Sequence, residues 1–115
     1  MLAADKTIKI INAWHNNRTD EHGEVTTRLD GCSAYFAHRA KAVAQGKNPA
    51  DYCKIRIPYR SGYMPSTYWE KHHPKNAWTL RIGDRVTVDG QMMTIMLIRD
   101  NTLRYPDPHW YVEAE

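Results

Sequence analysis

The chain has 115 residues, an apolar content of 42% and a net charge of +3, which suit one folded domain with a modest core and argue against a disordered chain. No apolar run approaches the ~20 residues that a membrane-spanning helix needs, and the N-terminus lacks the pattern of a signal peptide. We therefore expect a soluble chain made in a cytoplasm, with no membrane partner. Its two cysteines, Cys32 and Cys53, are then expected to be buried reduced thiols.

Positive charge is concentrated in the middle of the sequence. Residues 38–75 carry eight Lys or Arg against two acids, so the rest of the chain is net acidic. Because Lys and Arg displace counterions from phosphate, such a segment suits a surface near nucleic acid. A solvated surface with scattered charges is the simpler explanation.

The N-terminal part predicts a hairpin of two strands. Residues 7–15 offer Ile8, Ile10 and Trp14 to a core, and residues 25–30 form a β-branched, half-polar segment that pairs with them most simply. Gly31 either ends the second strand or forms a bulge in it.

The signals conflict after Gly31. Residues 33–37 extend a strand, whereas the Ala- and Lys-rich residues up to Gln45 favour a short helix or an ordered loop. Residues 52–58 then predict a strand closed by Pro58. Residues 59–76 show no regular period and are expected to be a long functional loop.

The strongest fold signal is the Asp89-Gly90 pair between two apolar-rich runs. This pair suits the positive φ angles of a tight turn, so residues 78–101 predict a β-hairpin, and residues 109–112 predict a last strand. The second arm of the hairpin is apolar on both faces. We expect Met93, Ile95 and Leu97 to fill the interior, and another layer or subunit to cover part of Met92, Thr94, Met96 and Ile98.

The residues offer little for catalysis. His72-His73 and the cysteines lack the short paired spacing of zinc sites, adjacent histidines in an extended loop point apart, and no glycine-rich phosphate loop is present. No Cys-His signature supports a nucleophile. Asp84, Asp89 and Asp100 are read as turn formers. We expect no enzyme, no catalytic residue, no metal site and no cofactor.

Basic and aromatic residues are interleaved over residues 54–71 and permit an alternative function. A small barrel could use them as a stacking platform, which makes a small basic β-barrel module that binds single-stranded nucleic acid the second hypothesis. The simpler role of these aromatic side chains is packing. The set is Lys54, Arg56, Tyr59, Arg60, Tyr63, Tyr68, Trp69 and Lys71.

An ordered set of short motifs in the second half of the chain carries a resemblance. The motifs are Ile55-Arg56-Ile57-Pro58, Trp78-Thr79-Leu80 with Gly83-Asp84, Val88-Asp89-Gly90, Asp100-Asn101 and Pro108-His109-Trp110-Tyr111-Val112. In order and spacing the chain resembles the small head-tail connector proteins of tailed bacteriophages and prophages of Gram-positive bacteria, over about residues 6–113. The Ala-rich segment and the double histidine depart from that pattern.

The resemblance implies a non-enzymatic virion component similar to head-closure or stopper proteins, made in the host cytoplasm. It implies a mainly β fold: one small antiparallel, SH3-like β-barrel domain over residues 1–115 with long loops near 38–52 and 59–76. It implies a homomeric ring of roughly six or twelve copies that closes or gates the DNA channel. Its partners would be the portal or adaptor ring, the tail terminator or tail tube proteins, and double-stranded DNA read without sequence specificity.

Two sets of residues are the candidates for these contacts. We expect residues 38–52 to face the lumen and residues 59–76 to contact protein. The DNA-channel candidates are Arg39, Lys41, Lys47 and Lys54. The ring or partner interface candidates are Tyr59, Tyr63, Tyr68, Trp69, Met92, Met96 and Ile98.

Overall fold

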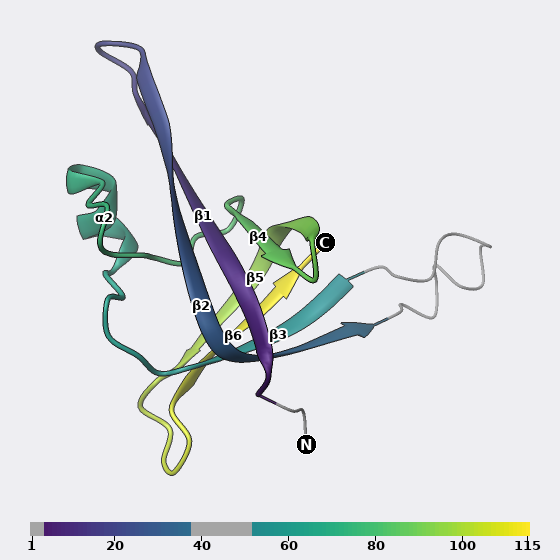
Figure 1. The fold of residues 1–115 in the computed structure, drawn as a ribbon. Coiled ribbons are helices and arrows are strands. Elements are labelled where there is room, and N and C mark those ends of the chain that lie inside the picture. The colour runs from purple at the N-terminus through teal and green to yellow at the C-terminus, as the bar shows by residue number, and fades with distance from the viewer. Residues whose placement is uncertain (1–3, 38–51) are drawn as a thin grey trace.

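The computed structural model describes residues 4–37 and 52–115, which form a closed antiparallel β-barrel of six strands with one short helix (Figure 1). The strand order around the barrel is β1-β2-β3-β6-β5-β4, and β4 pairs with β1 to close it. The predicted mainly β, small antiparallel barrel is therefore confirmed. In chain order the elements are β1 (Lys6–Asn16), β2 (Glu21–Ala37), β3 (Tyr52–Pro58), α2 (Ser66–His72), β4 (Arg85–Val88), β5 (Gln91–Asn101) and β6 (His109–Ala114).

The barrel interior is filled by one face of each strand. On β3 the inward residues are Cys53, Ile55 and Ile57, and on β4 they are Val86 and Val88; all are almost wholly inaccessible to solvent. Successive side chains in a strand point to opposite faces, so this alternation follows directly from the sequence pattern. The turn between β4 and β5 has positive φ at Asp89 (51°) and Gly90 (79°), which confirms the predicted hairpin.

Two long strands bend so that each belongs to both halves of the barrel. The first half of β2 pairs with β1 and its last residues pair with β3; β5 likewise pairs first with β4 and then with β6. A change of register accompanies each bend. It lies at Gly31 (φ 71°) on β2 and at Met96 on β5. Such bulges bend a strand and let a sheet close on itself.

The bulge at Met96 corrects one prediction. Met93 and Ile95 are buried in the core as expected, but Leu97, which pairs with Glu113, is only half-buried. Ile98 pairs with Val112 and packs against the core in its place. One extra residue in a strand turns every later side chain to the opposite face, and nothing in the sequence indicated that insertion.

β2 runs without interruption from Glu21 to Ala37, which confirms the strand expected up to residue 37 and the bulge at Gly31 rather than a strand end there. The segment after β3 differs from the sequence expectation. Residues 59–76 are not a structureless loop, because they contain α2, which follows Pro65 and ends at His72, with His73 as its C-cap at φ 43°. A seven-residue helix with one buried residue, Trp69, leaves no periodic signal in the sequence.

The β1–β2 hairpin extends beyond the barrel as a two-stranded arm, and α2 lies beside this arm (Figure 1). β4 pairs with β1 only over residues 8–11, and β3 pairs with β2 only from Ser33 onward, so the rest of the arm has two strands. In the described ranges, no helix is both long and apolar enough to cross a membrane.

Candidate interaction surface

A buried side chain joins the arm to the segment that precedes β4. Asn12 of β1 donates from Nδ2 to the carbonyl oxygen of Thr79 (2.9 Å), and the Thr79 N–H donates back to Asn12 Oδ1 (3.2 Å). The Asn12 side-chain amide thereby gives the backbone of Thr79, which lies outside the sheet, the two hydrogen bonds that a neighbouring strand would otherwise supply. Because both Asn12 and Thr79 are fully buried, leaving these polar groups unpaired would be costly.

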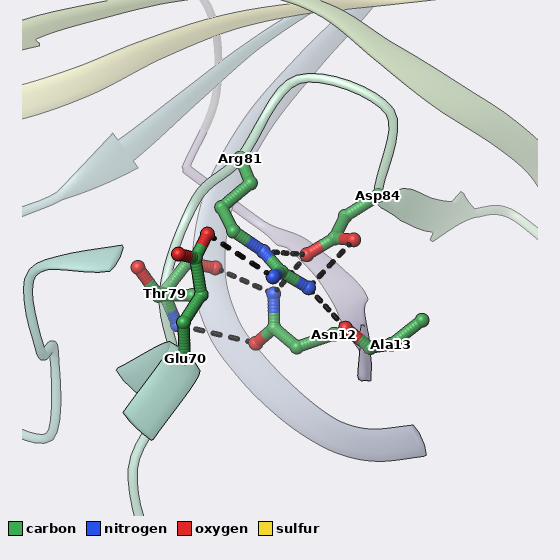
Figure 2. Close-up of polar contacts among 6 residues, drawn as sticks. All are labelled: Asn12, Ala13, Glu70, Thr79, Arg81 and Asp84. Carbon is green, nitrogen blue, oxygen red and sulfur yellow. Dashed lines mark hydrogen bonds and ion pairs between the residues drawn. The ribbon is translucent and has the colours of Figure 1, made fainter. Parts of the chain in front are cut away.

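Arg81 and Asp84 extend this contact into a polar cluster (Figure 2). Asp84 accepts from Asn12 Nδ2 (2.8 Å) and takes two hydrogen bonds from the Arg81 guanidinium, at 2.9 and 3.0 Å. Figure 2 shows that guanidinium between the carboxylates of Glu70 and Asp84; its Nη1 lies 3.4 Å from Glu70 Oε1, and Nη2 donates to the carbonyl oxygen of Ala13. One cation therefore ties together the arm, α2 and the turn before β4.

Aromatic rings form a second link between the arm and α2. The indole of Trp14 stacks on the imidazole of His73, with centroids 4.4 Å apart and planes 9° from parallel. His73 also contacts Trp69, and the Arg81 guanidinium lies 4.8 Å from the centre of the Trp69 ring. Trp69 is fully buried, so α2 is anchored by this single large side chain.

An open groove of about 650 Å³ lies beside the polar cluster. Apolar side chains of differing exposure form part of its lining, and the polar part comes from Ser66, Glu70, Arg81 and Asp84. Ile82, which is 67% exposed, is the most accessible apolar residue in it. The apolar lining residues are Ala13, Leu80, Ile82 and Ile98.

The predicted DNA-channel residues fall mostly outside the described part of the chain. Arg39, Lys41 and Lys47 lie there, as does the segment 38–45 for which a helix or loop was expected. Lys54 is described: it is half-buried on β3, with its Nζ 5.8 Å from the centre of the Tyr52 ring.

The predicted interface residues separate into two groups. Tyr59, Tyr68, Met92 and Met96 expose 62%, 61%, 55% and 48% of their surface. Trp69 and most of Tyr63 and Ile98 are instead occupied by packing within the chain. Tyr63 lies against Trp110 and Trp78, with ring centroids 4.7 and 5.2 Å apart.

The same packing removes most of the stacking platform considered from the sequence. Trp69 offers no face to a base. Arg56 forms an ion pair with Asp107, and Arg60 donates to the carbonyl oxygens of Asp30 (2.6 Å) and Pro58 (3.3 Å). Of the aromatic members, Tyr59 and Tyr68 stay exposed.

The described residues contain no group of three or more His, Cys, Asp or Glu side chains arranged to hold a metal ion. Cys32 and Cys53 are buried and unpaired, and burial raises the pKa of each thiol to about 11. Such thiols are protonated near neutral pH and are poor nucleophiles.

The three aspartates read as turn formers do not play the same role. Asp89 occupies a positive-φ turn position, and Asp100 accepts from the backbone N–H of Thr102 (2.9 Å). Asp84 also lies in a turn, but its carboxylate is buried in the polar cluster. Sequence reasoning missed the roles of Asn12, Arg81 and Asp84, because single polar residues far apart in the chain carry no spacing signal.

The whole length of the fold just described is shared with one protein family. Residues 3–115 match the family model described as a family of unknown function (DUF6751). The chain belongs to this family. No curated protein and no solved structure matches the chain significantly.

Proposed function

We propose that this family member is a non-enzymatic structural component of a phage head-tail connector. In this proposal copies of the chain form a homomeric ring below the portal or adaptor, close or gate the DNA channel, and dock the tail. The chain would be made in the host cytoplasm and incorporated into the virion.

The observation that carries the proposal is that the ordered motifs form one framework. Ile55 and Ile57 of β3 and Trp110 and Val112 of β6 face the same core, and β3 and β6 are paired neighbours. The Asp89-Gly90 turn joins β4 to β5. Residues spread over half the sequence thus build one small barrel, which supports reading them as the mark of a shared fold.

The outer face of β5 supports self-association. Met92 and Met96 are about half exposed, and Leu97, which follows Met96, is half-buried. Exposed large apolar side chains gain by being covered, at roughly 25 cal/mol per Å² of apolar surface. A neighbouring subunit in a ring is the cover that the proposal supplies.

The proposal assigns the basic segment of residues 38–52 to the lumen and residues 59–76 to protein contacts. The anchored helix α2 suits a protein contact, because Trp69 and the polar cluster hold it in one position while Tyr68 points outward. A reconstruction with residues 38–52 on the outer wall, away from DNA, would contradict this assignment.

A genetic complementation experiment tests the proposed function. A phage or inducible prophage that carries this gene is deleted for it, and wild-type chain, Met92→Lys/Met96→Lys or Met92→Leu/Met96→Leu is supplied in trans. The deletion should give packaged heads without joined tails, the Leu variant should restore tailed particles, and the Lys variant should fold but fail. Tailed, infectious particles from the deletion alone would overturn the proposal.

A further inference from the structure

The loop between β5 and β6 presents two apolar side chains fully to solvent. Leu103 is 100% exposed and Tyr105 is 94% exposed, with Arg104 between them. In Figure 1 this loop extends beyond the barrel on the side away from the turn that precedes β4. Neither side chain contributes to the core of its own chain, so only contact with another molecule would bury them.

Contacts at the base hold the loop in place. Arg56 pairs with Asp107, and His109, itself buried, has its Nδ1 2.8 Å from the Asp107 carbonyl oxygen. Asn101 Nδ2 lies 3.3 Å from His109 Nε2, and the Arg104 N–H donates to the carbonyl oxygen of Asn101 (3.1 Å). A loop ordered in this way loses little conformational entropy when its tip is bound.

The groove beside Ile82 is complementary to this loop in its apolar lining and in its charge. Its apolar lining suits Leu103 and Tyr105, and Glu70 at its edge is more than half exposed on its side chain. Glu70, Arg81 and Asp84 together leave the groove with one excess negative charge. Arg104 forms no ion pair within residues 4–37 and 52–115, so it is available to meet that charge.

We propose that Leu103, Arg104 and Tyr105 of one copy insert into the groove of Glu70, Leu80 and Ile82 of a second copy. Leu103 and Tyr105 are almost wholly exposed in their own chain, so a chain does not fill its own groove with this loop. Joining two different patches gives a head-to-tail contact, which closes into a ring when its rotation divides a full turn. The inference rests on the proposed function and names the contact between its subunits.

Disulfide trapping between separately prepared copies tests the contact. One protein carries Leu103→Cys and the other Ile82→Cys; the native cysteines are buried and do not compete. Mixing them under mild oxidation should give disulfide-linked dimers, with little linkage in either protein alone. A control mixture of Thr19→Cys, at the tip of the arm, with Ile82→Cys should give no disulfide-linked dimer.

Charge reversal checks the same contact by a second route. Arg104→Glu in the Leu103→Cys copy, or Glu70→Lys in the Ile82→Cys copy, should each lower the yield of linked dimer about tenfold. Combining the two reversals should restore most of the yield, whereas Arg18→Glu on the exposed arm should leave it unchanged. Circular dichroism of each variant verifies that it is folded.

Three results would overturn the inference: no linkage on mixing, self-linkage of Leu103→Cys as strong as the mixed product, or flotation with anionic vesicles that depends on Leu103. The outcome is separate from that of the proposed function. A chain found in the connector that fails to link refutes only this contact. A chain that links as expected but is absent from tailed particles refutes only the connector role.

Discussion

Replacing Asp84 with alanine removes the centre of the polar cluster. The variant loses one hydrogen bond from Asn12 and two from the Arg81 guanidinium, and it leaves a cation that is only 19% exposed on its side chain without its nearest counter-charge. Breaking a buried ion pair from one side costs roughly 3–5 kcal/mol. Arg81 keeps Glu70 and the Ala13 carbonyl, so we expect the lower end, about 3 kcal/mol.

Urea unfolding followed by tryptophan fluorescence measures this cost. With a slope of about 1–3 kcal/mol per M, the midpoint of Asp84→Ala should fall by roughly 1–3 M. Asp84→Asn keeps an acceptor for Asn12 without the charge and should lose about 1–2 kcal/mol. Asp5→Ala is the control, because Asp5 is exposed. If Asp84→Ala costs no more than Asp5→Ala, the cluster does not join the arm to the barrel as argued.

Three further predictions address other parts of the molecule. A Cβ on Gly23 would lie 2.8 Å from the Trp14 ring, so Gly23→Ala should cost about 1–3 kcal/mol in urea unfolding, and much less in a Trp14→Leu background; equal costs in both would refute the contact. The pKa of Cys32 and of Cys53 is raised from 9.0 to about 11 in the folded chain, so the unfolded chain loses these protons first as pH rises. The free energy of unfolding should therefore fall between pH 9 and 11, by up to about 2–3 kcal/mol per thiol. Cys32→Ala should show a shallower fall than wild type over that range, and identical slopes would contradict the burial. In a titration with single-stranded and duplex DNA, the connector proposal predicts weak, similar binding to both, and Tyr68→Ala should leave it unchanged; a strong preference for single strands that Tyr68→Ala abolishes would favour the stacking module.

Most strands of the barrel could be predicted because each has a local signal in the sequence, and the resemblance supplied their arrangement as a barrel. The alternation around Ile55 and Ile57 predicts a strand, and the Asp-Gly pair after Val88 predicts a hairpin, each from a few neighbouring residues. The two bulges could not be read in the same way. Gly31 at least permits a bulge, whereas nothing distinguishes Met96 from its neighbours, so the inward residue after it was predicted one position too early.

The candidate surface was only partly predictable, for a different reason. Aromatic side chains in an irregular segment serve either packing or contact, and the sequence does not say which. Trp69 and Tyr63 proved to be packing residues, while Tyr59 and Tyr68 are exposed. The polar cluster depends on residues 67 and 72 positions from Asn12, and that proximity exists only once the barrel has closed.

The most direct test of the connector role is a cryo-electron microscopy reconstruction of the neck of tailed particles made by a host that carries this gene. We expect a ring between the portal or adaptor and the tail whose repeating density fits the closed barrel of β1–β6, with β5 of each copy covered by a neighbour. A neck whose every ring is fitted by other proteins, in particles that lack this chain by mass spectrometry, would contradict it.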